Sequence, residues 1–343
     1  SRYAANEALT LLVANRVPHD KPGEEIAQPL LVWQSALNGV IGDRLEATAN
    51  PLEIAMSLCR NGRAIEPNDA ELGRAIESAS GTLIVFVHGL GMSDLSWHNA
   101  DGVRFGDRLE REGQGFSLDL RYNSGHRISA NGREFSELLN DLYSAHASAI
   151  RRIVLIGHSM GGLVCRSTCD RAQRHELAWS AALDEVICLG TPHFGAPLER
   201  LGDWLSVLLA ATPVTRSLAR LANTRSAGVK DLRDGWTGIL DRQRDIDTCA
   251  AEPNAVASLP FAERVHWRFV AATRGTRADG ERARWLGDGL VPVPSALGQR
   301  EDDPAGSLRV PATHRRVFTR MGHIDLLTDV RVYAQLRKWI ARK

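Results

Sequence analysis

A serine between two glycines is the most informative group of residues in this chain. Residues 157–161 read Gly-His-Ser-Met-Gly, match G-x-S-x-G and directly follow the apolar run Ile153–Ile156. A short, mostly β-branched run bounded by glycine is typical of a strand buried on both faces. The residues after Gly161 continue in a helical pattern, so we expect a sharp strand-to-helix turn that presents Ser159 to a cleft as a nucleophile. The alternative is an ordinary glycine-rich turn in which Ser159 caps the helix.

A nucleophilic serine needs a base, and the base needs an acid to orient it. For a serine on this kind of turn, the acid and then the base follow later in the chain. The histidines beyond the serine are His175, His193, His266, His314 and His323. Only His193 and His323 follow predicted strands within loops. Because His323 follows the last strand, we expect it to be the general base, and we expect His193 to face the substrate. A simple turn residue is the alternative for His193.

Asp288 is the expected acid because it follows the predicted strand at 265–271 and lies between two glycines that permit a tight loop. Its rivals Asp279, Asp302 and Asp303 resemble solvated loop charges. An Asp-Gly pair alone usually marks only a turn. The position of Asp288 in the chain order is what favours a catalytic role.

Two backbone N–H groups are expected to stabilise an oxyanion. One belongs to Met160, at the start of the helix that follows Ser159. The other belongs to Leu90, in the loop that His88 and Gly89 open after the predicted strand at 82–87.

Alternating strands and helices must position these groups. Apolar runs predict strands at 82–87, 116–122, 153–156, 185–189, 265–271 and 316–319, and helices at 104–112, 132–149, about 160–175 and 328–340. This alternation predicts a mostly parallel sheet covered by helices on both faces. Residues 277–289 are typical of a charged, glycine-containing loop.

The alternation breaks at residues 198–260, which hold amphipathic helical segments after a strand's carboxyl end. Ligands bind at that end of open α/β sheets, so we expect a lid whose apolar side chains contact the substrate. The lid residues expected to do so are Trp204, Leu205 and Leu209. A structural helical insertion is the alternative.

The same patterns divide the chain into an N-terminal extension and a catalytic domain. Residues 1–81 are expected to be an N-terminal extension that packs on the main domain, with a helix at 30–49, a strand at 54–58 and a hairpin turn at 60–63. Residues 82–343 are expected to be the catalytic domain.

Composition limits the classes of function. The chain has 343 residues, 43% hydrophobic and 24% charged, as is usual for a globular protein. A net charge of +1 argues against a nucleic-acid partner. No apolar run reaches the roughly 18 residues of a membrane span. No charged-then-apolar leader opens the chain, which favours a cytoplasmic location, although a leader removed before Ser1 would fit secretion.

At this point the sequence resembles the α/β-hydrolase superfamily and, more narrowly, the bacterial true lipases. The resemblance covers 82–343 in outline and rests on residues 87–90, 157–161, 190–195, 287–291, 295–297 and 322–325. It implies the same acid, Asp288, and the same base, His323. Members with a lid hydrolyse acyl esters, including triglycerides. In those lipases the aspartate two residues after the catalytic histidine binds a structural calcium ion, and Asp325 holds that place. A second calcium-binding aspartate has no convincing counterpart, so helix capping is the alternative for Asp325.

The sequence therefore predicts an α/β-hydrolase fold with a helical lid. We expect a carboxylic ester hydrolase that acts on lipid-like or polyester substrates through an acyl-enzyme, requires no cofactor and touches a lipid surface transiently. An acyltransferase or amidase with the same triad is the alternative among enzymes. A catalytically inactive binding module is the alternative of another class, and an intact Ser159, Asp288 and His323 argue against it.

Overall fold

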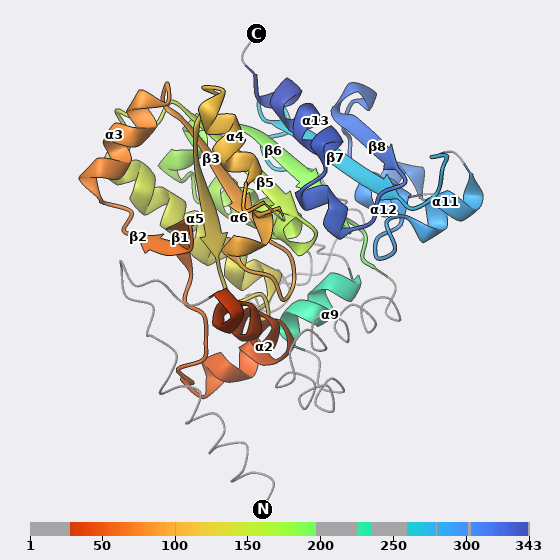
Figure 1. Cartoon of the computed structure of the whole chain (residues 1–343), viewed down its shortest axis with the longest axis horizontal. Coiled ribbons are helices and arrows are strands. Elements are labelled where there is room, and N and C mark those ends of the chain that lie inside the picture. The colour runs from red at the N-terminus through yellow and green to blue at the C-terminus, as the bar shows by residue number, and fades with distance from the viewer. Residues whose placement is uncertain are drawn as a thin grey trace, which may run out of the picture.

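An eight-stranded sheet forms the centre of the molecule (Figure 1). The structure is a computed structural model, and it describes residues 28–99, 101–196, 226–234, 259–278, 280–300 and 303–341. The strands are β1 (Ser57–Arg60), β2 (Arg63–Ile65), β3 (Thr82–Val87), β4 (Phe116–Arg121), β5 (Arg152–His158), β6 (Leu183–Leu189), β7 (His266–Thr273) and β8 (Arg315–Thr319). Their order across the sheet is β2-β1-β4-β3-β5-β6-β7-β8.

Strands β3 to β8 are all parallel, and only β1 and β2 run against their neighbours. The turn between β1 and β2 has positive φ at both central residues, Asn61 (51°) and Gly62 (79°). Asn-Gly is the dipeptide that favours such a two-residue hairpin. The expected hairpin turn is therefore confirmed, although the first strand begins at Ser57, three residues later than its apolar pattern predicts.

The described helices are α2 (Gln28–Ala47), α3 (Ala70–Ser78), α4 (Phe105–Arg111), α5 (Ile128–His146), α6 (Met160–Arg174), α9 (Ala227–Asp234), α11 (Glu281–Leu286), α12 (Val293–Ala296) and α13 (Val330–Ile340). Helices α4 and α13 cover one face of the sheet, and α5 and α6 cover the other (Figure 1). None of the helices in the described ranges combines the length and apolarity needed to cross a membrane.

The core has two layers because strand side chains alternate between the faces. On β3, Leu83, Val85 and Val87 pack with α5 and α6, while Ile84 and Phe86 pack with α4 and α13. All six residues of β3 are buried. This explains why the strand reads as a continuous apolar run without alternation.

The strands and long helices predicted from the sequence are confirmed, with boundaries shifted by a few residues. The segment 277–289 is an exception, because it contains the short helix α11 where a loop was expected. Its Trp285 is 64% exposed. A six-residue helix with an exposed aromatic residue has no apolar face, and so it leaves no helical period in the sequence.

The N-terminal extension reaches the loops at the carboxyl edge of the sheet. A Cβ on Gly39 of α2 would lie 2.7 Å from Gly91 Cα, in the loop after β3. A Cβ on Gly42 would lie 1.9 Å from the Asn123 side-chain oxygen, in the loop after β4. These two glycines therefore allow α2 to approach both loops closely.

The predicted lid at 198–260 lies outside the described residues, apart from 226–234 and 259–260. Trp204, Leu205 and Leu209 are among the residues not described, so the lid stays a prediction. The described helix α9 is anchored on α2, because Ser226 Oγ donates to Gly39 O at 2.8 Å and Ala227 N donates to Asp43 Oδ2 at 3.1 Å. Figure 1 shows α2 and α9 together beyond the carboxyl ends of the strands.

A buried ion pair connects the hairpin to the loop after β3. Arg121, the last residue of β4, donates from Nε to Asp94 Oδ1 at 2.8 Å and from Nη2 to Gly62 O at 2.8 Å. Neither side chain of the pair is more than 1% exposed. A buried charge is costly unless it is paired, so each partner depends on the other.

We therefore expect Asp94→Asn to lower the free energy of unfolding by about 3–5 kcal/mol, because it removes the negative charge next to the buried Arg121 guanidinium. The measurement is urea denaturation monitored by circular dichroism. The double variant Asp94→Leu/Arg121→Met should recover part of the loss, because it removes both charges. A loss below about 1 kcal/mol in the single variant would contradict a tightly coupled buried pair.

Candidate active site

Ser159 lies at the predicted turn, between the end of β5 and the start of α6. Its backbone has φ 54° and ψ −123°, which is unfavourable for a residue with a side chain. Its N–H donates to Leu189 O on β6 at 2.8 Å, and its carbonyl accepts from Gly162 N at 3.1 Å. These bonds hold a strained turn whose side chain leaves the sheet at its carboxyl edge.

The glycines on either side of Ser159 are required by close backbone contacts. A Cβ on Gly157 would lie 2.5 Å from Gly162 Cα, so strand and helix could not meet as they do. A Cβ on Gly161 would lie 2.2 Å from Val87 O at the end of β3. The turn therefore depends on both glycines of the motif.

His323 and Asp288 form a buried pair at the same edge of the sheet. His323 Nδ1 lies 2.7 Å from Asp288 Oδ2, and the two side chains are 4% and 0% exposed. A carboxylate accepts, so the Nδ1 proton lies toward Asp288 and Nε2 is the nitrogen that can take up a proton. The structure thus brings together the acid and base predicted from chain order.

The loop after β7 holds the Asp288 carboxylate in a fixed orientation. Its Oδ1 accepts from the backbone N–H groups of Leu290 and Val291, at 2.9 and 2.8 Å. Its backbone carbonyl accepts from Arg274 Nε and from His323 N, both at 3.1 Å. Oδ2 therefore remains directed at the histidine, which was not evident from the Asp-Gly pair in the sequence.

The loop after β3 lies against the serine. A Cβ on Gly89 would lie 3.1 Å from Ser159 Cβ, so the Gly89-Leu90 backbone runs beside the nucleophile. The N–H of Gly91 donates to Ser124 Oγ at 2.9 Å, which anchors this loop to the one after β4. Within the described ranges, the N–H groups of Leu90 and Met160 have no hydrogen-bond acceptor, as is needed for donors that would bind an oxyanion.

His158 is a residue whose part in the site was missed by sequence reasoning. Its Nε2 donates to His323 O at 3.0 Å, and the two rings lie 4.6 Å apart. Burial, followed by the neighbouring His323, lowers the pKa of His158 well below its ordinary value, so it stays neutral. His158 therefore holds the loop of the expected base, and its place next to Ser159 in the motif was the available signal.

His193 is buried within the protein, at 1% exposure. Its ring packs on Phe269 of β7 with ring centroids 4.1 Å apart, and Nδ1 lies 3.3 Å from Arg166 Nη1 of α6. Burial, followed by Arg166, lowers the pKa of His193 well below its ordinary value. These contacts are all with protein groups, and the expected role of His193 toward the substrate stays a prediction.

Asp325 has a structural contact in its own loop. Its Oδ2 accepts from Gly322 N at 2.7 Å, next to the expected base. Among the described residues, the group of three candidate ligands with atoms within 4.8 Å of one another is Glu46, Glu53 and His126, which does not include Asp325. Calcium binding at Asp325 therefore stays a prediction.

The strand order, the parallel crossovers and the turn at Ser159 define an α/β-hydrolase fold, which confirms the expected fold class. Residues 78–232, which include the turn, match the model of the PGAP1-like alpha/beta domain family. A comparison with curated proteins found no match.

Solved structures with a similar arrangement include three hydrolases. The mature lipase BlEst2 of Bacillus licheniformis is 20% identical, with a TM-score of 0.47 over 76% of this chain and 91% of that one. The esterase PF2001 of Pyrococcus furiosus is 14% identical, with a TM-score of 0.42 over 76% and 83%. The phospholipase PlaB of Legionella pneumophila is 14% identical, with a TM-score of 0.39 over 63% and 45%.

The burial of His88, in the loop beside Ser159, makes the free energy of unfolding depend on pH. It is fully buried, its ring stacks on Tyr122, and burial lowers its pKa to about 4. An unfolded histidine titrates near 6.5, so between these values the unfolded chain binds a proton that the folded chain does not. The contribution of His88 is therefore present above about pH 6.5 and is lost as the pH falls toward 4.

We expect His88→Gln to reduce the difference in unfolding free energy between pH 7 and pH 5 by about 2 kcal/mol relative to the wild type. Urea denaturation at the two pH values measures this difference. The exposed His266→Gln serves as the control and should change it little. An unaltered pH dependence in His88→Gln would show that His88 is protonated in the folded state.

Proposed function

We propose that this protein is a serine hydrolase that cleaves carboxylic esters, with Ser159 as nucleophile, His323 as general base and Asp288 as the acid that orients it. The observation that carries the proposal is the strained turn at Ser159 on the same sheet edge as the His323–Asp288 pair. A non-glycine residue in this conformation is costly and persists only where the surroundings enforce it. A turn that merely links strand to helix would not require it.

The chemistry follows from the placement of these groups. His323 Nε2 takes the proton of Ser159 Oγ as the oxygen attacks the ester carbonyl. The negative oxygen of the tetrahedral intermediate is stabilised by the N–H groups of Leu90 and Met160. His323 then gives the proton to the leaving alkoxide, an acyl-Ser159 forms, and water activated by the same histidine releases the acid. Asp288 accepts the Nδ1 hydrogen bond throughout and stabilises the imidazolium.

The proposed substrate class rests on the amphipathic pattern of residues 198–260. If Trp204, Leu205 and Leu209 lie over the cleft, they would contact an acyl chain, and each buried methylene would contribute about 0.8 kcal/mol. Support comes from α9, the described part of this segment, which packs on α2 near the loop after β3. We therefore propose lipid-like esters as substrates and transient contact with lipid surfaces.

The direct test is Ser159→Ala. We expect kcat for p-nitrophenyl esters to fall by several orders of magnitude, up to about 10⁶-fold, because no other group can form the acyl-enzyme. The exposed Ser78→Ala on α3 is the matched control and should retain activity. The ester series should run from acetate to long acyl chains, since a lipid-like substrate predicts a rate that rises with chain length. Activity of Ser159→Ala within tenfold of wild type, with unchanged circular dichroism, would refute the nucleophile.

The identity of the base is tested by pH. Since His323 must be neutral to accept the serine proton, kcat/KM should rise from acid to neutral pH. His193→Ala should keep this limb, because the buried His193 is neutral throughout, whereas His323→Ala should abolish activity at every pH. The opposite result, with activity lost in His193→Ala and kept in His323→Ala, would assign the base to His193.

A further inference from the structure

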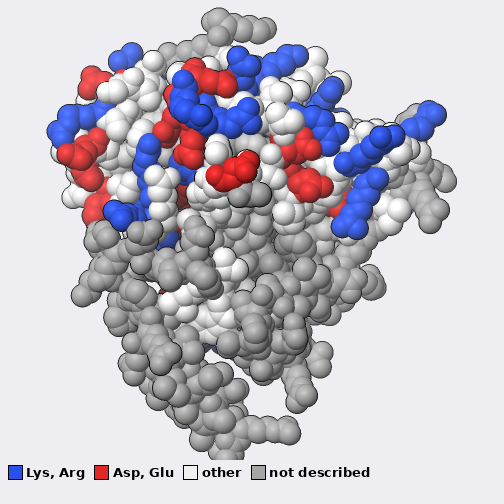
Figure 2. All heavy atoms as spheres, viewed as in Figure 1, with Lys and Arg blue, Asp and Glu red and all other residues white. Residues whose placement is uncertain are grey.

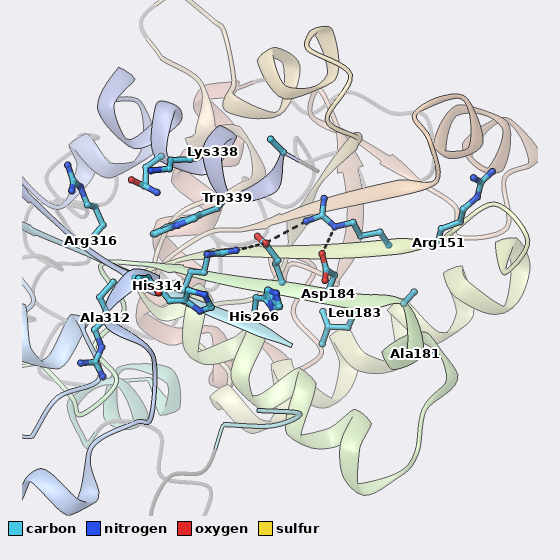
Figure 3. Close-up of a pocket in the computed structure, with 18 residues that line it drawn as sticks. Arg151, Ala181, Leu183, Asp184, His266, Ala312, His314, Arg316, Lys338 and Trp339 are labelled. Atoms are coloured by element: carbon cyan, nitrogen blue, oxygen red, sulfur yellow. Dashed lines mark hydrogen bonds and ion pairs between the residues drawn. The ribbon is translucent and has the colours of Figure 1, made fainter. Parts of the chain in front are cut away.

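A groove lies at the opposite edge of the sheet from Ser159. It is formed by the first residues of β5, β6, β7 and β8, by the segment before β8 and by the last turns of α13, and its volume is about 1220 Å³ (Figure 3). The proposed active site is at the carboxyl ends of these strands. Strands of five to eight residues place the two edges roughly 20 Å apart. The groove is thus a separate site.

The lining of this groove is strongly cationic. It contains six cationic side chains, Arg151, Arg152, Arg268, Arg315, Arg316 and Lys338, and two carboxylates, Asp184 and Glu185. The whole chain carries a net charge of only +1, and on the face shown in Figure 2 basic and acidic side chains are interspersed. The excess of positive charge is therefore local to the groove.

The two carboxylates are already neutralised by two of the arginines. Glu185 Oε1 accepts from Arg268 Nη2 at 2.9 Å and lies 3.6 Å from Arg152 Nη2. Asp184 pairs with Arg152 Nε. The Arg268 guanidinium also lies over the Trp339 ring, 5.2 Å from its centroid. In this ion-pair network, drawn with dashed lines in Figure 3, the charges of the two carboxylates are matched by those of Arg152 and Arg268.

Four cations of the groove therefore lack an anionic partner. Arg151, Arg316 and Lys338 form no ion pair with any described residue, and Arg315 donates only to a backbone carbonyl, Leu308 O, at 3.0 Å. Burial lowers the pKa of Arg315, which shows that its charge is partly desolvated without compensation. Unpaired cations that line one groove attract a multiply charged anion.

Two of these cations lie at one end of the groove. Figure 3 shows Arg316 and Lys338 there and Arg151 at the far end, with Trp339 between the two cations and the rings of His266 and His314. The His266 and His314 rings lie 5.7 Å apart. Guanidinium groups match phosphate oxygens with paired hydrogen bonds.

We propose that this groove binds a ligand carrying two phosphate groups, with Arg316 and Lys338 as its main contacts. Each phosphate ester carries a charge of about −1.5 to −2, so two of them match the unpaired charges of Arg315, Arg316 and Lys338. The volume of the groove exceeds the needs of one phosphate, which favours a diphosphate or an organic molecule that carries one. Binding here requires none of the groups proposed for ester hydrolysis.

The test is calorimetric titration of the full chain with inorganic pyrophosphate at fixed ionic strength, repeated on Arg316→Gln/Lys338→Gln. We expect saturable binding to the wild type, weakened at least about tenfold in the double variant because two charge-assisted contacts are lost. The control Arg133→Gln/Arg309→Gln removes two exposed charges outside the groove and should bind within about twofold of wild type. Ester hydrolysis should be unchanged in both double variants, and Ser159→Ala should still bind pyrophosphate.

Three results would overturn the proposal. The first is the absence of saturable pyrophosphate binding up to about 10 mM, because a specific site would bind with a much lower dissociation constant. The second is an equal loss in the two double variants, which would indicate attraction by net charge alone. The third is binding to vesicles of phosphatidylcholine with phosphatidylglycerol but not to pyrophosphate, which would indicate a membrane surface as the partner.

Discussion

The backbone of Ser159 is the constraint on which the site depends. A residue with φ 54° and ψ −123° is stable only because β5, α6, β3 and β6 all meet at this point. Its N–H is held by β6, and Gly161 lies against the last carbonyl of β3. The conformation of the turn therefore depends on the parallel sheet around it. Strain of about 1–3 kcal/mol is stored where a nucleophile would act.

The same edge of the sheet collects every other group of the proposed site. Parallel strands end together, so loops after β3, β5, β7 and β8 meet although they lie far apart in sequence. Backbone hydrogen bonds then fix the details: His158 holds the carbonyl of His323, and Leu290 and Val291 orient Asp288. The N-terminal helix α2 extends this arrangement, because Gly39 lies directly on the loop that carries Leu90.

The sequence predicted what depends on local pattern and chain order. The apolar runs located β3 and β5, and the order of serine, aspartate and histidine selected the pair that the structure joins at 2.7 Å. It could not predict contacts that depend on tertiary packing. The role of His158 depends on a backbone carbonyl 165 residues away. The helix α11 leaves no helical pattern of apolar residues in the sequence. The burial of His193 against Phe269 depends on how distant segments pack together.

The two edges of the parallel sheet differ in the charged and titratable side chains that they hold. At the carboxyl edge, the carboxylate of Asp288 and four histidines, His88, His158, His193 and His323, are buried. At the amino edge, arginines that begin the strands exceed the acids that could neutralise them. Arg152 and Arg268 pair with Asp184 and Glu185 and match their charges. Since Arg316 and Lys338 gain nothing from that network, their placement beside it is best explained by an anion that they bind together.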